Sequence, residues 1–200
     1  MFASIVAHDL RNPLNVADGY LAVLREDQNT EAVATIGDAH DRMEAIIEGL
    51  LTLAREGRDL GETEPVVLSD PIKQCWQDVE TVDATLQVVD DIELVADRSR
   101  LQQLLENLFR NAVEHAGPDV TVTIGRLDGG FYVADDGPGI APDQRETVFE
   151  AGVSTTADGT GFGLSIVQEV ADAHGWTIQL ADSTDGGARF EITDVDIRPD

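Results

Sequence analysis

Apolar residues recur every three or four positions along the first quarter of the chain, which is the spacing of one face of an α-helix. Two such stretches, 2–24 and 33–54, flank a short polar break at 25–31. The second has a heptad-like stripe at Val33, Ile36, His40, Met43, Ile47, Leu50 and Ala54. The pattern predicts an all-α helical hairpin. Because one hairpin cannot bury both stripes, we expect two copies to pair as a dimeric four-helix bundle.

Residues 58–65 are rich in glycine and acids and are typical of a linker between a domain at 1–57 and a second domain at 66–200. The second domain mixes alternating and helical spacing, so it is expected to be α/β. Strands are expected at 66–68, 86–89, 92–95, 120–124, 131–134, 178–180 and 188–192. Helices are expected from about 70, at 97–115 and from near 161 to 174.

Local signals refine these elements. Ser69 or Asp70 is predicted to cap the first of these helices, and Gly175 is expected just beyond the last. The pair Asp90-Asp91 is predicted to form the turn between strands 86–89 and 92–95. Gly129-Gly130 is predicted to join strands 120–124 and 131–134 as a hairpin.

The formal net charge of −26 argues against binding nucleic acid or an anionic membrane through a basic surface. The acids are spread along the whole chain, which we interpret as adaptation to a salt-rich cytoplasm, as in a halophile, where counterions screen self-repulsion. No apolar run approaches the roughly 20 residues of a membrane span, so no direct membrane contact is expected. The single cysteine, Cys75, excludes an intrachain disulfide.

Two glycine pairs in the second domain carry the main chemical signal. The first is Asp135-Asp136-Gly137-Pro138-Gly139-Ile140, and the second is Gly159-Thr160-Gly161-Phe162-Gly163-Leu164. An aspartate can accept a hydrogen bond from the exocyclic amine of adenine, and glycine lets the backbone approach a ligand closely. The second pair opens a helix, whose free N–H groups favour phosphates. Together they predict a nucleotide pocket that is neither a P-loop nor a dinucleotide fingerprint.

The helix at 97–115 places Asn107, Asn111 and Glu114 on one face. An amide oxygen such as that of Asn111 suits Mg²⁺, which keeps several waters and shares phosphate oxygens. A solvated polar face is the alternative for an isolated helix. Near the amino end, His8 and Asn12 share a helix face beside Asp9. A neutral imidazole is a capable nucleophile, and a neighbouring carboxylate can orient it and take up its proton. A surface histidine is the alternative.

These motifs, in this order, resemble the transmitter region of two-component sensor histidine kinases over almost the whole chain. The residues from His8 to Leu14 resemble the H-box, and those from Asn107 to Ala112 with His115 resemble the N-box. The two glycine pairs resemble the G-boxes, with Phe149-Glu150 as the F-box. The resemblance implies a HisKA-type dimerization and phosphoacceptor domain followed by a two-layer α/β sandwich of the Bergerat (GHKL, HATPase_c) type.

The resemblance also implies roles for individual residues. His8 would accept the γ-phosphoryl group of ATP, with Asp9 as acid/base partner and Asn12 positioning water during dephosphorylation. Asn111 would hold Mg²⁺, supported by Asn107. The remaining expected nucleotide contacts are His115, Asp135, Gly137, Gly139, Thr160, Gly161, Phe162, Gly163 and Leu164. Residues 151–160 would form the lid over ATP, and the phosphoryl group would pass to an aspartate of a response-regulator receiver domain.

Two departures from the family pattern concern nucleotide affinity. Thr156 stands where many members have a lysine in the lid, and Glu114 stands where many have a cation after the N-box. Arg145 is a candidate to replace the missing lid cation. This part of the protein is expected to be cytoplasmic, and a sensor domain is expected to precede His8 in a longer parent protein that is either membrane-attached or soluble. The alternatives are a dimeric phosphotransfer or scaffold protein with feeble ATP binding, and an ATPase-driven clamp that would not use His8.

Overall fold

The computed structural model describes residues 60–79, 83–117, 119–145, 147–150, 161–184 and 186–198, together with Ile36 and Met43. Ile36 and Met43 are each helical, as the stripe at 33–54 predicts. The rest of the expected hairpin lies outside the described residues. The resemblance therefore remains the basis for the hairpin, whereas the second domain can be followed element by element.

A mixed five-stranded sheet forms one layer of the second domain. Its strand order is β2-β4-β5-β7-β6, in which β2 runs parallel to β4 and the other neighbours are antiparallel. The strands are β2 (Thr85–Val88), β4 (Thr121–Leu127), β5 (Gly130–Asp135), β6 (Thr177–Asp182) and β7 (Ala188–Thr193). Strands β4 and β5 form the predicted hairpin, in which Leu127 faces Gly130 and Gly129 lies in the turn with a φ of 73°.

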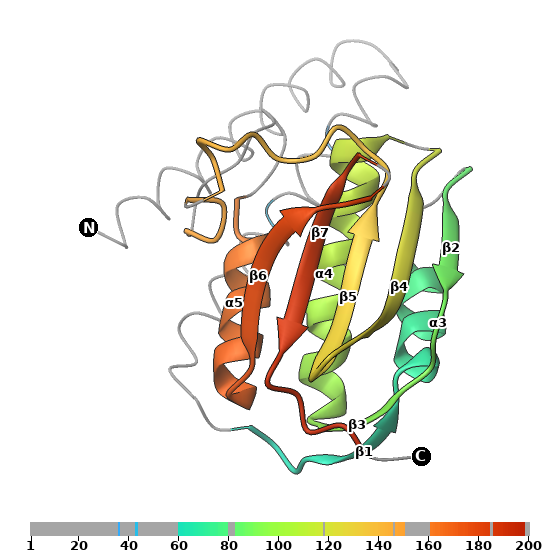
Figure 1. Cartoon of the computed structure of the whole chain (residues 1–200), viewed down its shortest axis with the longest axis vertical. Helices are drawn as coiled ribbons and strands as arrows, with labels where there is room; N and C mark the ends of the chain where they lie inside the picture. Colours follow the sequence, from blue (N-terminus) through green and yellow to red (C-terminus); the bar gives the residue numbers. More distant parts are fainter. Residues whose placement is uncertain are drawn as a thin grey trace. The chain divides into compact units, whose positions relative to one another are not determined.

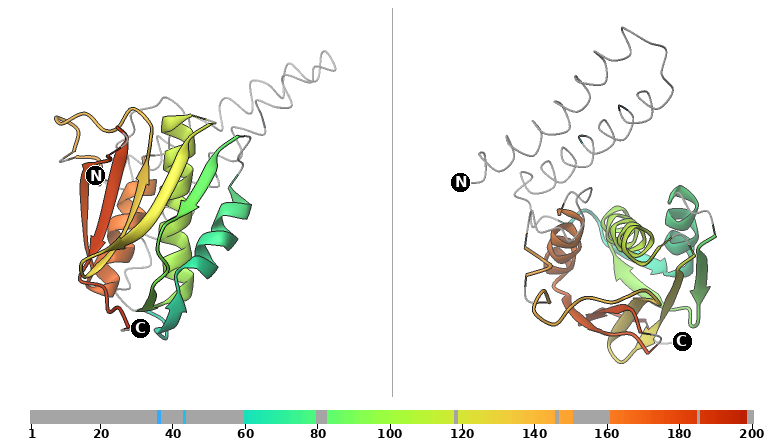
Figure 2. Two further views of the ribbon diagram at one scale, coloured as in Figure 1. Left: turned by 45° about the vertical axis from the view of Figure 1, so that its right-hand side comes forward. Right: turned by 90° about the horizontal axis from the view of Figure 1, so that it is seen from above.

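Three helices form the second layer and cover one face of this sheet (Figures 1 and 2). They are α3 (Ser69–Asp78), α4 (Arg98–Ala116) and α5 (Gly163–His174). The expected apolar face of α4 is buried at Leu101, Leu104, Leu105, Leu108 and Ala112, together with Phe109. Alternate residues of β4, β5 and β7 are buried against it, including Val122, Ile124, Phe131, Val133, Phe190 and Ile192. The two-layer α/β sandwich predicted for this domain is therefore confirmed.

A second, two-stranded sheet joins β1 (Glu64–Val67) to β3 (Glu93–Ala96) in antiparallel register. Ile197 adds an isolated bridge to Leu94. Strands β2 and β3 follow each other around Asp90-Asp91 as predicted, but they do not pair, because β2 joins the large sheet and β3 the small one. Local periodicity identifies a strand without specifying its partner, which depends on contacts distant in sequence.

The helix ends show which capping predictions were right. Beyond α5, Gly175 has a φ of 74°, and the Trp176 amide donates to the Ala171 carbonyl at 2.9 Å, as in a glycine-terminated helix. The predicted cap of α3 by Ser69 or Asp70 is wrong, since no side chain of its N-cap residue makes a capping bond. Instead, the Ser69 amide donates to Asp91 Oδ1 at 3.0 Å, so the cap comes from the turn after β2.

A polar cluster joins the start of α4 to the end of α5 and to the segment before β1. Asp97 Oδ1 caps α4 by accepting from the amides of Ser99 and Arg100, and Oδ2 accepts from the Gly61 amide at 2.9 Å. His174 Nε2 accepts from the Asp97 amide at 3.1 Å. Its Nδ1 lies 2.8 Å from the Val170 carbonyl, so Nδ1 carries the proton and the ring is neutral.

Candidate functional site

Asp135 ends β5, next to the last turn of α4, and it is the centre of the candidate site. The residue is only 9% exposed. Its Oδ1 accepts hydrogen bonds from the amides of Gly137 at 3.0 Å and Ala188 at 3.1 Å. Both hydrogen bonds are accepted by Oδ1, and Oδ2 accepts none from the described residues. The carboxylate is thus held in one orientation while one oxygen is left to accept from a ligand.

The surroundings of Asp135 act on its protonation in opposite directions. Burial raises the pKa of its carboxyl group above the usual value. The two amide bonds lower the pKa, the nearby charge of Asp136 raises it, and His115 lowers it. Burial prevails, so ionising this carboxylate costs more than ionising an exposed one. A ligand that donates a hydrogen bond to the carboxylate would offset part of that cost.

The first glycine pair has no room for side chains. A Cβ at residue 137 would lie 2.2 Å from the Ala116 side chain at the end of α4. Gly139 has a φ of 72°, a conformation that L-residues rarely adopt. These two positions let segment 135–139 turn closely over the end of α4, whereas the sequence analysis assigned the glycines to a close approach of a ligand.

A further glycine pair, which the sequence analysis did not single out, lies behind Asp135. A Cβ at residue 187 would lie 2.2 Å from the Asp135 carbonyl oxygen, and one at residue 139 would lie 3.3 Å from the Gly186 carbonyl oxygen. Gly186 and Gly187 belong to the turn between β6 and β7, which the Ser183 amide closes on the Gly187 carbonyl at 2.9 Å. The sequence signal was present, because two glycines directly precede a predicted strand.

The N-box residues lie along α4. Asn107 is half-buried, and its Nδ2 donates to the Gln103 carbonyl at 2.8 Å. Its Oδ1 lies 3.4 Å from where a Cβ on Gly163 would be, so Asn107 adjoins the first residue of α5. Asn111 and His115 follow one and two turns later and are half-buried. Their spacing leads from the start of α5 toward Asp135, whose pKa responds to His115.

The remaining predicted site residues fall into two groups. Gly161 has a φ of 70°, and Leu164 is half-buried in the first turn of α5, one residue after Gly163. Phe162 directly precedes α5. His8, Asp9, Asn12 and the whole of the expected lid at 151–160, which includes Thr160, lie outside the described residues.

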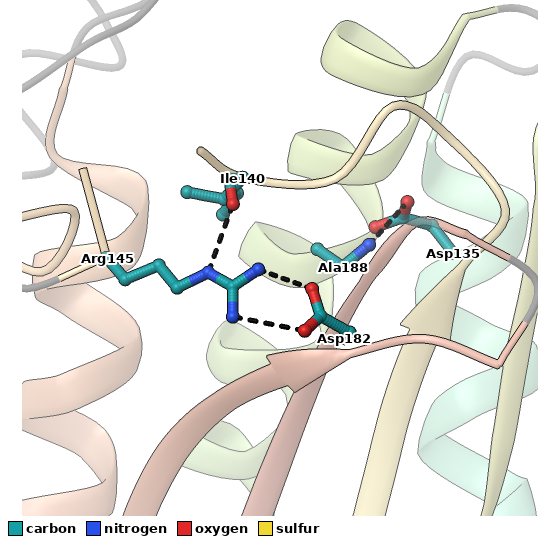
Figure 3. Close-up of polar contacts among 5 residues, drawn as sticks. All are labelled: Asp135, Ile140, Arg145, Asp182 and Ala188. Carbon is teal, nitrogen blue, oxygen red and sulfur yellow. Dashed lines mark hydrogen bonds and ion pairs between the residues drawn. The ribbon is translucent and has the colours of Figure 1, made fainter. Parts of the chain in front are cut away.

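Arg145, the candidate replacement for the lid cation, has other partners (Figure 3). Its Nε donates to the Ile140 carbonyl at 3.1 Å. Its two terminal nitrogens donate to the two carboxylate oxygens of Asp182, at the end of β6. In this structure the guanidinium therefore joins two segments of the protein.

The usual metal ligands do not cluster among the described residues. Within them, no three or more His, Cys, Asp or Glu side chains gather as a metal site. The side-chain oxygen of Asn111, which makes no recorded hydrogen bond within them, fits a Mg²⁺ ion that takes its other ligands from water and phosphate. In the same part of the chain, no helix combines the length and apolar character needed to cross a membrane.

Two protein-family models match this chain over the residues that form the candidate site and over its first 58 residues. The model of the histidine kinase-, DNA gyrase B- and HSP90-like ATPase family matches residues 96–198. The model of the His Kinase A phospho-acceptor domain matches residues 1–58. The matches lie in the order expected from the motifs, and the first contains both asparagines of α4, Asp135 and the start of α5.

Relatives and solved structures support the same family. The sensor histidine kinase ZraS of Salmonella typhimurium is 30% identical over 205 residues, which are 95% of this chain and 44% of that protein. This chain therefore spans less than half the length of that curated relative. The mycobacterial sensor histidine kinase MprB has a TM-score of 0.60 at 28% identity, covering 68% of this chain and 99% of the solved one. Full-length ShkA in complex with AMPPNP has a TM-score of 0.67 at 28% identity, covering 99% and 46%. The chain belongs to the family of histidine kinase-, DNA gyrase B- and HSP90-like ATPases, and its first 58 residues match the phospho-acceptor domain of histidine kinases.

Proposed function

We propose that this chain is the kinase core of a sensor histidine kinase, in which ATP bound at 66–200 phosphorylates His8 in the domain at 1–57, across a linker at 58–65. The match of both family models in this order, and the relatives, support the proposal. The observation that carries it is the buried Asp135 carboxylate, fixed through Oδ1 with Oδ2 left to accept from a ligand.

ATP is the proposed substrate of the second domain. Asp135 Oδ2 accepts from the amino group of adenine, and the phosphates lie at the start of α5, near Gly161, Gly163 and Asn107. The binding of AMPPNP, an ATP analogue, to the similar protein ShkA supports this assignment. Thr160, Phe162, Leu164 and His115 complete the proposed contacts. Asn111 holds Mg²⁺, which when bound neutralises phosphate charge.

The proposed reaction transfers one phosphoryl group to a ring nitrogen of His8. The nitrogen lone pair forms a bond to the γ-phosphorus, and the bond from that phosphorus to the β,γ-bridging oxygen breaks, so ADP leaves with the bonding electrons. Asp9 accepts the proton released from the imidazole. An aspartate of a response-regulator receiver domain then takes the phosphoryl group, and Asn12 positions water when the phosphorylated partner is hydrolysed.

Labelling with γ-³²P-ATP and Mg²⁺ tests this function directly, with His8→Gln as the matched variant. We expect the chain to retain label that is stable in base, labile in acid and absent from His8→Gln. Addition of a cognate receiver domain should move the label to that domain. Wild-type chain that binds ATP but gains no label would contradict the kinase assignment.

A phosphotransfer or scaffold protein with feeble ATP binding is the second candidate. Two observations favour it: Glu114 is exposed on α4 where many relatives have a cation, and Arg145 is paired with Asp182. Such a protein would accept a phosphoryl group from a phosphorylated receiver domain at His8 without labelling from ATP. An ATPase clamp would instead hydrolyse ATP equally well with His8→Gln.

Three further properties belong to this proposal. The chain forms a homodimer through the helical hairpin at 1–57. It acts in the cytoplasm, without nucleic acid and without direct membrane contact in this part of the protein. Its net charge of −26 suits a salt-rich interior.

A further inference from the structure

Each of the three guanidinium nitrogens of Arg145 donates a hydrogen bond, and the acceptors lie on two separate segments of the protein. Nε donates to the Ile140 carbonyl at 3.1 Å, Nη1 donates to Asp182 Oδ2 at 3.3 Å, and Nη2 donates to Asp182 Oδ1. Figure 3 shows the guanidinium between the carbonyl and the carboxylate. A planar fork suits this arrangement, whereas a lysine ammonium cannot match a carboxylate in a bidentate manner.

The two segments that Arg145 joins are those that meet at Asp135. Ile140 directly follows Gly139 in the first glycine pair. Asp182 is the last residue of β6, and the turn that follows it leads to Ala188, whose amide donates to Asp135 Oδ1 at 3.1 Å. A closed path of contacts therefore runs from Asp135 through Ile140, Arg145 and Asp182 back to Asp135.

The backbone segments along this path are tightly packed at its centre. A side chain at Gly187 would overlap the Asp135 backbone, and one at Gly139 would press against the Gly186 carbonyl oxygen. The turn at 183–187 and the segment at 135–140 are in direct contact, so a shift of one displaces the other. Displacement of the turn also moves the Ala188 amide, which orients the Asp135 carboxylate.

Resting on the proposed function, we propose that Arg145 is a positioning residue for the adenine end of the nucleotide. Its pair with Asp182 holds the turn between β6 and β7 against the first glycine pair, and so keeps Asp135 Oδ2 directed at the base. In this structure Arg145 does not supply the lid cation, because Nε and both terminal nitrogens donate to protein oxygens of Ile140 and Asp182.

The Arg145 side chain is 30% exposed and that of Asp182 is 76% exposed. An exposed ion pair contributes little to global stability. The effect of the pair is therefore expected in ligand binding rather than in the melting temperature.

Nucleotide binding by single variants of the full chain separates positioning from phosphate contact. Calorimetric titrations with ATP, ADP and AMP at one fixed KCl concentration would compare Arg145→Lys and Asp182→Asn with the wild type. We expect both variants to bind all three nucleotides more weakly than the wild type by a similar factor, about two- to fivefold. The kcat for His8 labelling should be unchanged at saturating ATP.

A phosphate-contacting Arg145 predicts a different pattern. Asp182→Asn would then bind ATP as tightly as the wild type or more tightly, and Arg145→Lys would leave AMP unaffected. Either result would overturn the proposal, as would unchanged binding in both variants.

The exposed pair of Arg198 and Glu93, 3.3 Å apart beside the small sheet, provides the control. Arg198→Lys and Glu93→Gln should leave nucleotide binding unchanged. If the wild type bound no adenine nucleotide, the proposed function would fail and this inference with it. If the wild type bound ATP and labelled His8 while the Arg145 and Asp182 variants matched it, only this inference would fail.

Discussion

At the scale of single residues, burial determines how two titratable groups behave. Asp135 and His174 lie at opposite ends of the domain, one at the end of β5 beside the last turn of α4 and the other beside the start of α4. Burial raises the pKa of Asp135 and lowers that of His174, because in each case it disfavours the charged form. The consequences differ, since Asp135 is proposed to bind a ligand and His174 makes only intramolecular contacts among the described residues.

Replacing Asp135 by Asn tests its role in binding the base. The amide side chain keeps an oxygen for the amides of Gly137 and Ala188, but it would direct an NH₂ group at the adenine amine, so two donors would face each other. We expect titration calorimetry to show ATP affinity falling by about tenfold or more. Stability should not fall, because the ionised carboxylate is already disfavoured by burial. An Asp135→Asn variant that bound ATP as the wild type does would contradict the assignment.

His174 should make the stability of the domain depend on pH near neutrality. Its folded pKa is lowered below 6.5, chiefly by burial, so the unfolded chain takes up a proton first as the pH falls. The stabilisation is complete above pH 6.5 and is lost as the pH drops through that value toward the folded pKa.

Urea unfolding at pH 7.5 and pH 5.5 measures this effect. The wild type should lose more stability between the two values than His174→Leu does. The variant itself should be less stable at pH 7.5 by about 1–3 kcal/mol, because the buried Asp97 amide loses its acceptor. Equal pH dependence in the two proteins would contradict the assignment of this effect to His174.

At the scale of elements, sequence reasoning succeeded where the determining signal is local. The apolar spacing of α4, the alternation of β4 and β5, and the glycine after α5 each depend on neighbours within a few residues. The parallel pairing of β2 with β4 was not predicted, because β3 and α4 separate Thr85 from its partner Thr121 along the chain.

In the candidate site, too, local sequence predicted some features and missed the contacts between distant segments. The first glycine pair and the N-box could be found from motifs, since their spacing along the chain is fixed by a turn and a helix. Asp135 contacts Gly187 and accepts a hydrogen bond from the Ala188 amide. These residues lie more than fifty positions from Asp135, and no local sequence pattern encodes the contact. The pairing of Arg145 with Asp182 was missed for the same reason, because Asp182 lies 37 positions further along the chain, at the end of β6.

The cap of α3 from the turn after β2 leads to a prediction at this scale. Asp91 Oδ1 accepts from the amides of both Ser69 and Ile92, at 3.0 Å each. Asp91→Ala should therefore cost about 1 kcal/mol of unfolding free energy in urea. The neighbouring exposed Asp90 is the matched control, and Asp90→Ala is expected to change stability by less than about 0.5 kcal/mol. Equal losses would indicate a general effect of the turn.

At the scale of the whole molecule, charge is the dominant feature. The chain of 200 residues has a net charge of −26, so its acidic side chains repel one another in dilute buffer. At 0.01 M salt this repulsion extends over about 30 Å. At 1 M salt the range falls to about 3 Å, so the repulsion is largely screened. We expect the thermal unfolding midpoint, followed by circular dichroism, to rise steeply between dilute buffer and about 1 M KCl.

A matched sucrose series separates screening from the general exclusion of solutes, since sucrose stabilises compact states without screening charge. Replacing the exposed acids Asp83, Asp90 and Asp172 by Asn should move the rise of the unfolding midpoint to lower KCl concentrations, because each replacement removes one negative charge. A folded state that is fully stable in dilute buffer, or a rise of equal size in sucrose, would contradict the salt-adapted interpretation. The same KCl series would set the conditions for nucleotide binding, because the repulsion between ATP and an acidic domain is screened by the same ions.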